Sequence, residues 1–449
     1  MAYHRFEQFQ DMLYRLYPEL HAGDDSSAVG DYKLCKLTRT VTLQVTEACN
    51  LQCSYCYQIN KGCKKMSFEV AKKLIDKLLR DDESFNGYIN CENSPGLILE
   101  FIGGEPLLEV DLIEQICDYF FEQAVLLEHP WATKCCISIT SNGTLYFTPN
   151  VQRFLQKYKG YVSFSITLDG NKELHDMCRK FPDGSPSYDL AEAAVKDWMQ
   201  RGLFMGSKVT LSPQNISYLY EAFINMVNLN YTEIMANVVY EKGWEAEHAT
   251  IMYEQQKKIA DYILDNDLEN KLYCSLFEAH IGTPLDEYAL DNWCGGTDLM
   301  LAMDPDGNLY PCLRYMKTSL GPDVEPIVIG HVDRGIYITE KEQQVMKCMS
   351  CITRRTQSTD KCFYCPIASG CGWCSAYNYQ ELGSPDARCT YICQMHQARV
   401  LANTYFWNKY FRKMQSSDRL KVHCPKEWAL EFISEEEYDF LVEYSKEGD

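Results

Sequence analysis

The feature that most constrains the fold is a regular alternation of strand and helix patterns between residues 38 and 243. Short apolar runs typical of buried strands are each followed by an amphipathic stretch typical of a helix. The expected strands are 40–46, 97–102, 136–140, 161–168, 204–211 and 234–239, and the expected helices are 67–80, 110–127, 151–158, 189–201 and 216–228. This alternation predicts an α/β fold with a parallel sheet wrapped by helices. Six units make a partial (β/α)6 version of the eight-unit TIM-like barrel.

The flanking segments have a different character. An amphipathic helix is expected at 4–17 within an N-terminal helical extension, 1–37. The barrel, 38–243, is followed by a helical connector, 244–290, a Cys- and Gly-rich segment with little periodicity, 291–395, and a C-terminal helical segment, 396–449. The Cys-rich segment has too little apolar periodicity to predict a large core, so metal clusters are expected to stabilise it.

Cysteine content and charge limit the possible partners. The chain has 22 cysteines, a net charge of −20, no secretory signal at its start and no apolar run near the roughly 20 residues of a membrane span. We therefore expect a cytoplasmic protein without a nucleic-acid or membrane partner, since phosphates require Lys and Arg. Disulfides are rare in the cytoplasm, so this many cysteines indicates metal sites or iron–sulfur clusters.

Three cysteines follow the first expected strand in a C-x3-C-x2-C loop, Cys49, Cys53 and Cys56. Three thiolates can ligate three irons of a [4Fe–4S] cluster and leave the fourth iron open. A zinc site is the alternative, but structural zinc sites normally have four ligands, often as C-x2-C pairs. The spacing therefore favours an iron–sulfur cluster with one free iron.

Polar motifs end the next strands, where parallel sheets bind ligands. The second strand runs into Gly103-Gly104-Glu105-Pro106, in which glycines allow close backbone approach and Glu105 offers an acceptor for an ammonium group. The third runs into Ser141-Asn142. The fourth ends at Thr167-Leu168-Asp169-Gly170 and is followed by His175, Asp176 and Arg179, whose guanidinium matches a carboxylate.

Together these motifs resemble the radical S-adenosylmethionine (SAM) superfamily. The resemblance implies that Glu105 binds the SAM amino group, that Ser141 faces the ribose and that Arg179 meets the SAM carboxylate. The implied cofactor-binding residues are Tyr55, Tyr57, Gly103, Gly104, Glu105, Pro106, Ser141, Asn142, Asp169, Arg179 and Ser212. No catalytic residue is assigned from the sequence.

A second cysteine array reads Cys294-x12-Gly307-x4-Cys312, then Cys362-x2-Cys365-x5-Cys371-x2-Cys374, then Cys393. It resembles the SPASM domain, which carries two auxiliary [4Fe–4S] clusters, so the likeness covers about residues 38–395. It implies three clusters in all. Cys294, Cys312 and Cys374 would bind the first auxiliary cluster, and Cys362, Cys365, Cys371 and Cys393 the second. A pair of zinc ribbons is the alternative.

Some positions depart from the family pattern. Two residues rather than three separate Cys371 from Cys374, and Cys389 competes with Cys393 as the last ligand. The first auxiliary cluster lacks an evident fourth cysteine, so either Cys348 or Cys351 closes it or one iron stays open. Sulfatase maturases place an Asp where this chain has Leu313, which argues against that activity.

The resemblance implies a peptide maturase that generates a 5′-deoxyadenosyl radical. The expected substrate is a ribosomally made, Cys-rich precursor peptide, and the expected product is a Cys thioether, with flavodoxin or ferredoxin as external electron donor. Carbon–carbon crosslinking, formylglycine formation and a non-enzymatic iron–sulfur or zinc scaffold are the alternatives. Because only 48 residues precede Cys49, we do not expect a full winged-helix leader-binding domain in this sequence.

Overall fold

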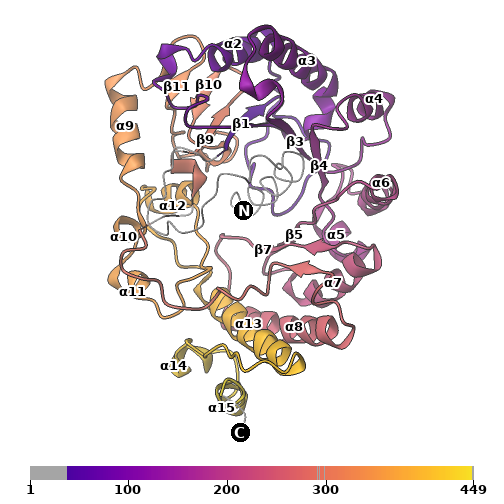
Figure 1. Cartoon of the computed structure of the whole chain (residues 1–449), viewed down its shortest axis with the longest axis vertical. Coiled ribbons are helices and arrows are strands. Elements are labelled where there is room, and N and C mark those ends of the chain that lie inside the picture. Colours follow the sequence, from indigo (N-terminus) through magenta and orange to yellow (C-terminus); the bar gives the residue numbers. More distant parts are fainter. Residues whose placement is uncertain (1–37, 291, 293, 298, 447–449) are drawn as a thin grey trace.

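The computed structural model describes residues 38–290, 292, 294–297 and 299–446 (Figure 1). The expected extension over 1–37, with its helix at 4–17, lies outside the described residues. Within the described part, no helix combines the length and the apolar character needed to cross a membrane.

One eight-stranded sheet organises both halves of the described chain. Its order is β12-β11-β10-β9-β1-β2-β3-β4. The strands β1 (Arg39–Gln44), β2 (Leu97–Ile102), β3 (Cys135–Ser141) and β4 (Val162–Ile166) are parallel neighbours, and β9 (Met300–Met303) pairs in parallel with the other edge of β1. Antiparallel β10 (Asn308–Tyr310), β11 (Gly330–His331) and β12 (Gly335–Ile336) extend it. The predicted α/β fold with a parallel sheet is confirmed.

Helices cover the outer side of these strands. Figure 1 shows α2 (Phe68–Leu79), α3 (Val110–Leu126), α4 (Pro149–Lys157) and α6 (Tyr188–Gln200) around them. The α2 helix begins where Ser67 Oγ accepts the Val70 N–H at 3.3 Å, and its apolar stripe, which includes Leu74 and Leu78, is buried. Burying each such side chain contributes about 2 kcal/mol, so hydrophobic periodicity decides which face of the helix meets the sheet.

The sheet breaks after β4. The expected strand 204–211 is reduced to β5 (Val209–Leu211), which pairs with β7 (Ala236–Val238), while β6 (Glu233–Ile234) pairs with β8 (Tyr273–Cys274). Beside β4, the Ile166 N–H donates to the Met205 thioether at 3.4 Å. The Met205 thioether thus accepts the hydrogen bond that a carbonyl of the next strand was expected to accept. The strand predicted from residue 204 therefore begins only at Val209.

The remaining elements complete the two halves. The helices are α5 (Lys172–Cys178), α7 (Leu219–Asn228), α8 (Ala246–Asp265), α9 (Glu340–Ser350), α10 (Arg354–Gln357), α11 (Asp360–Phe363), α12 (Ser375–Leu382), α13 (Cys393–Lys413), α14 (Lys426–Ala429) and α15 (Glu435–Tyr444). Short 3-10 turns lie at Glu83–Phe85, Pro106–Glu109, Pro130–Ala132, Ile216–Tyr218, Gly295–Thr297 and Leu313–Tyr315. The Cys-rich segment has a small apolar core of its own, which includes Tyr315, Met316 and Met349.

Strand register brings the ends of the parallel strands to one edge. Gln44 of β1 lies beside Ile102 of β2, and Ser141 of β3 lies beside Ile166 of β4. The polar motifs that follow each strand are therefore neighbours in space, as expected for a parallel sheet.

Candidate active site

The loop with the first three cysteines is held on both sides by backbone bonds. Gln52 N–H donates to the Lys180 carbonyl at 2.8 Å, and Ser54 N–H donates to the Cys178 carbonyl at 2.9 Å. The side chains of Cys49, Cys53 and Cys56 remain partly exposed. The loop is thus fixed against the segment after β4.

The glycine motif after β2 packs directly under this loop. Glu105 N–H donates to the Ala48 carbonyl at 2.9 Å. A Cβ added to Gly104 would lie 2.4 Å from the Ala48 oxygen and 2.6 Å from the Cys49 Cβ. Only glycine fits, because contacts this short do not occur between real side chains and backbone.

The Glu105 carboxylate joins the ends of β2 and β3. It is 1% exposed, and it accepts bonds from Ser141 Oγ at 2.8 Å and from Asn142 N–H at 2.8 Å. Burial raises the pKa of Glu105, and these bonds oppose that effect. Asn142 Nδ2 donates to Asn50 Oδ1 at 2.8 Å, which links the same strand end back to the cysteine loop.

Arg179 and Asp169 meet through Tyr55. Arg179 Nη1 donates to the Tyr55 hydroxyl at 3.0 Å, and that hydroxyl donates to Asp169 Oδ2. Burial lowers the pKa of Arg179, but the nearby Tyr55, Cys53 and Asp169 outweigh it, so the net pKa lies well above the usual value. A permanently charged guanidinium therefore lies between the cysteine loop and the end of β4.

His175 and Ser187 form hydrogen bonds that hold the backbone carbonyl of Arg179. Ser187 Oγ donates to the Arg179 carbonyl at 2.7 Å and lies 3.0 Å from His175 Nε2, while His175 Nδ1 accepts the Asp169 N–H at 3.2 Å. The imidazole therefore carries its proton on Nε2 and is neutral, since burial lowers the pKa of His175 to about 3.

This buried imidazole predicts a pH-dependent stability. An unfolded histidine titrates near pH 6.5, so between pH 6.5 and 3 the unfolded state binds the extra proton and folding stability falls as pH falls. From pH 7.5 to 5.5 the expected loss is up to about 1.4 kcal/mol. His175→Gln should reduce this pH dependence in urea titrations of the anaerobic protein, whereas His280→Gln, at an exposed position, should not. Equal slopes in wild type and His175→Gln would contradict the assignment.

The strand-end residues fit the amino-acid part of SAM. They offer a carboxylate for an ammonium and a guanidinium for a carboxylate. Two of their polar atoms, Arg179 Nε and Ser212 Oγ, are buried and have no hydrogen-bond partner among the described residues. Buried polar atoms are normally satisfied, so both are available to a bound ligand.

The spacing of the thiols does not suit a single metal ion. Tetrahedral zinc with Zn–S bonds near 2.3 Å holds its sulfurs about 3.8 Å apart. Among the described residues, the group of three or more donor atoms within 4.8 Å of one another is Asp81, Cys91 and His129, and it contains none of the predicted ligands. Within the described residues, the predicted cysteine ligands are therefore not arranged as a compact single-ion site.

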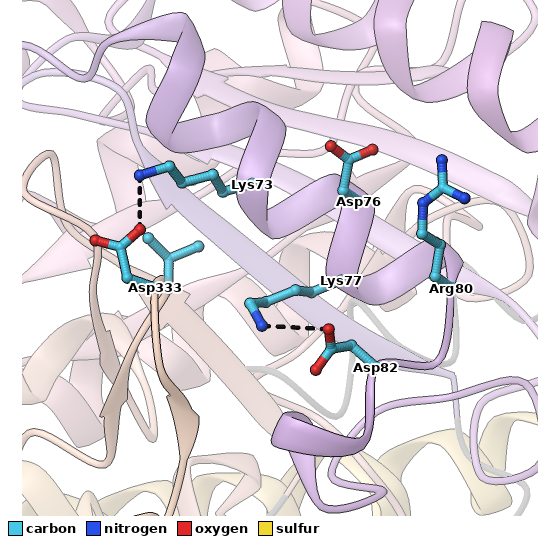
Figure 2. A pocket seen from close by; sticks show the side chains of 7 residues that line it. Lys73, Asp76, Lys77, Arg80, Asp82 and Asp333 are labelled. Carbon is cyan, nitrogen blue, oxygen red and sulfur yellow. Dashed lines mark hydrogen bonds and ion pairs between the residues drawn. The ribbon is translucent and has the colours of Figure 1, made fainter.

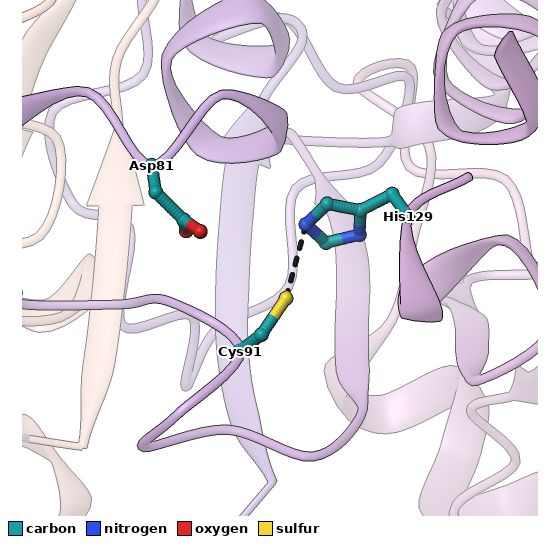
Figure 3. Close-up of side chains that lie close together, drawn as sticks. All are labelled: Asp81, Cys91 and His129. Atoms are coloured by element: carbon teal, nitrogen blue, oxygen red, sulfur yellow. Dashed lines mark hydrogen bonds between the residues drawn. The ribbon is translucent and has the colours of Figure 1, made fainter. Parts of the chain in front are cut away.

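That trio lies at the opposite edge of the sheet, before β2 and β3 (Figure 3). Cys91 Sγ is 3.1 Å from His129 Nε2, and His129 Nδ1 accepts the Trp131 N–H at 3.2 Å. Because Nδ1 is an acceptor, the proton is on Nε2 and points at the sulfur. A metal would need that Nε2 lone pair, so the arrangement serves as a hydrogen bond between two loops.

A surface pocket on α2 is also separate from this chemistry. Figure 2 shows its lining, which includes Lys73, Lys77, Asp82 and Asp333. Lys73 Nζ lies 2.6 Å from Asp333 Oδ1, and Lys77 Nζ lies 3.3 Å from Asp82 Oδ2. Its cations and anions neutralise one another, and it lies away from the strand ends.

In the second half, Cys294, Cys312 and Cys374 come together. A Cβ on Gly296 would lie 3.0 Å from the Cys312 sulfur and 3.6 Å from the Cys294 sulfur. Burial raises the pKa of Cys312, and the thiols of Cys294 and Cys374 raise it further. Ser375 Oγ lies 3.2 Å from Cys294 Sγ.

A second group contains Cys362, Cys365, Cys371 and Cys393. Burial raises the pKa of Cys393 to about 12, with further contributions from the other three thiols. Cys389 is placed differently, because its main thiol neighbour is Cys374. The structure thus gathers the four cysteines that the SPASM likeness implies for the second cluster.

Cys348 and Cys351 are exposed at the end of α9. Neither is among the main electrostatic influences on the thiols of Cys294 or Cys312. The prediction that one of them supplies a fourth ligand therefore gains no support from this arrangement. Tyr57 directly follows Cys56 in the loop, and the Arg314 guanidinium lies 5.3 Å from its ring centre. Pro106 begins the 3-10 turn after Glu105.

Sequence reasoning missed several supporting residues. Asn50, Thr144 and Ser187 complete the hydrogen-bond network around the strand ends. Arg388 contacts a cysteine sulfur of the second group. Asn50 stands inside the cysteine loop, and Thr144 follows the Ser141-Asn142 motif and bonds Asn142 directly, so both carry a local sequence signal. Ser187 and Arg388 reach their sites only through tertiary packing.

The chain is similar in sequence to one protein family and to several known proteins. Residues 38–175 match the family described as a 4Fe-4S single cluster domain. An uncharacterized protein of Methanocaldococcus jannaschii is 28% identical over 60% of this chain and 83% of its own length. Mycofactocin maturase MftC of Mycolicibacterium smegmatis is 25% identical over 78% and 82%. The serine-type anaerobic sulfatase-maturating enzyme of Bacteroides thetaiotaomicron is 24% identical over 61% and 68%.

Solved structures share the fold. That of native anSMEcpe with bound AdoMet and Cp18Cys peptide superposes with a TM-score of 0.58 at 16% identity, over 84% of this chain and 98% of that one. Streptococcus suis SuiB bound to precursor peptide SuiA gives a TM-score of 0.51 at 15% identity, over 78% and 74%. At these identities the likeness concerns the fold alone.

Proposed function

The chain belongs to the radical SAM/SPASM-type family, and on this premise we propose that it modifies a precursor peptide by forming a Cys thioether. The observation that carries SAM chemistry is the set of groups at one sheet edge. Glu105, Arg179 and the Cys49, Cys53 and Cys56 loop are held together there, with Arg179 Nε and Ser212 Oγ still unbonded among the described residues.

In this proposal each residue of the site contacts one part of SAM. When bound, SAM and its cluster supply a 5′-deoxyadenosyl radical. Glu105 accepts bonds from the SAM ammonium, Arg179 donates to its carboxylate, and Ser141 and Asn142 border the ribose. The buried strand ends exclude water from the reacting atoms.

Formation of a thioether from a thiol and a C–H group removes two hydrogens from the peptide. Bound SAM would supply the radical that removes one hydrogen atom from a substrate C–H, and 5′-deoxyadenosine would be left. The substrate thiol loses its proton to solvent, its sulfur bonds to the carbon, and one surplus electron remains. Clusters held by the two cysteine groups would supply an acceptor for that electron, and an external donor such as flavodoxin or ferredoxin would supply the one electron that SAM cleavage requires.

The test has two stages. Reduced, reconstituted protein incubated with SAM should form 5′-deoxyadenosine, and a non-enzymatic scaffold would not.

Coexpression with a short Cys-rich peptide encoded by a neighbouring gene should lower the peptide mass by two hydrogens per crosslink. Alkylation then distinguishes the bond: a thioether removes a free thiol, whereas a carbon–carbon crosslink leaves every thiol reactive. An unchanged peptide mass excludes both crosslinks.

Arg179 gives a sharper prediction. Arg179→Lys keeps the charge but loses the planar fork, and losing hydrogen bonds to a charged group costs about 1.5–3 kcal/mol. We expect SAM affinity to fall by about 10- to 100-fold in equilibrium dialysis. Arg153→Lys, at an exposed ion pair with Asp111 and Glu114, should keep wild-type affinity. Equal affinities in the two variants would contradict a carboxylate contact at Arg179.

A further inference from the structure

Arg388 places a guanidinium directly against the second group of cysteines. Its Nη2 lies 3.1 Å from the Cys371 sulfur and 3.5 Å from the Cys371 carbonyl oxygen. The positive charge also reaches other members of the group, because it lowers the pKa of Cys393 and Cys365 against the larger raising effect of burial. One side chain therefore gives both an N–H···S bond and a charge to the same thiols.

Other cations nearby are directed to oxygen atoms. Arg354 donates to the carbonyls of Asp286, Ala289 and Phe363 at 2.6 to 2.8 Å. Lys242 lies 2.6 Å from Glu381. The bond from Arg388 to sulfur is therefore a specific contact of this side chain. It does not result from a general excess of positive charge around the cysteines.

The backbone next to Arg388 is anchored. Cys389 N–H donates to Asn378 Oδ1 at 3.0 Å, and Asn378 N–H donates to the Cys374 carbonyl at 2.9 Å. Asn378 is buried in α12. The segment that carries Arg388 is thus tied to the helix that begins beside the first cysteine group, which holds the guanidinium at its distance from Cys371.

We propose that Arg388 is a positioning residue that raises the reduction potential of an iron–sulfur cluster held by Cys362, Cys365, Cys371 and Cys393. This rests on the proposed function, since it requires a cluster at that group. Reduction adds a negative charge to a cluster that four thiolates already make negative. A cation and a hydrogen bond to one sulfur stabilise the reduced state more than the oxidised state.

The test is a potentiometric titration of the full-length, reconstituted chain, followed by electron paramagnetic resonance. A Cys49/Cys53/Cys56→Ala background removes the first cluster's signal, and Cys371→Ala identifies the signal of the second group. In Arg388→Gln the midpoint of that signal should move to a more negative potential. Arg388→Lys, which keeps the charge, should recover part of the shift. Arg355→Gln should leave the midpoint unchanged, because Arg355 is an exposed cation that faces Asp360 at 3.3 Å.

The outcomes separate the two proposals. An intact signal and iron content with an unchanged midpoint in Arg388→Gln would overturn the role of Arg388 alone. Equal shifts in the Gln and Lys variants would also overturn it, since they would indicate a structural change rather than an effect of charge. If Cys371→Ala alters neither iron content nor any signal, no cluster is bound there, and the cluster assignment and this inference fail together.

Discussion

Cys53→Ala is expected to abolish 5′-deoxyadenosine formation and to lower the iron content by one cluster per chain. A cubane held by three thiolates with one open iron has no spare protein ligand, so removing one of them removes the site. Cys53 is also the cysteine whose environment includes the Arg179 charge, which opposes the rise in its pKa caused by burial. Anaerobic reconstitution, iron analysis and chromatographic detection of 5′-deoxyadenosine measure both effects.

Cys63→Ala is the matched control. Cys63 lies a few residues further along the same stretch and is exposed, so its removal should change neither iron content nor SAM cleavage. Wild-type product formation by Cys53→Ala, or an equal loss in Cys63→Ala, would show that the C-x3-C-x2-C loop does not bind the cluster that cleaves SAM.

Gly104→Ala should lower SAM cleavage by at least about 100-fold, the effect of a misplacement of about 1 Å in an active site. The new methyl group would lie 2.4 Å from the Ala48 carbonyl oxygen and 2.6 Å from the Cys49 Cβ. Both neighbours belong to the cysteine loop, and neither is the end of a flexible side chain. The loop must therefore move, which displaces Cys49 and separates Glu105 from its place beside it.

Gly160→Ala supplies the comparison, because nothing lies within 4 Å of the Cβ it would add. It should retain wild-type cleavage. Circular dichroism and urea titration of both variants show whether the fold is intact. A folded Gly104→Ala protein with wild-type cleavage would contradict the close packing between the glycine motif and the cysteine loop.

Local sequence was a good guide to the first site because its residues follow strands directly. Glu105, Ser141 and Asp169 each stand at or just after a strand end, and parallel strands place their ends together whatever the surrounding loops do. The same reasoning failed for the strand expected at 204–211. Its apolar pattern was correct for burial, but Met205 points its sulfur at the β4 edge, which no periodicity reveals.

Some of the residues that stabilise the two sites through hydrogen bonds could not be predicted from the sequence. Ser187 lies eight residues beyond the Arg179 carbonyl that it bonds, and Arg388 lies 17 residues beyond the sulfur that it contacts. Polar residues in loops have many possible partners, and which one is met depends on how distant segments pack. Likewise, β9 joins β1 across more than 250 residues and so makes one sheet from two halves.

The sequence by itself therefore determined the α/β class, the cysteine spacings and the chemistry available at each strand end, since these follow from local periodicity and from residue type. The tertiary structure decided which groups meet. It placed the Tyr55 hydroxyl between Arg179 and Asp169. It placed Cys393 with the second cysteine group and Cys389 nearer Cys374. It also brought the Arg388 guanidinium to the Cys371 sulfur. Local patterns select backbone conformation, but contacts between distant side chains arise only when the whole core packs.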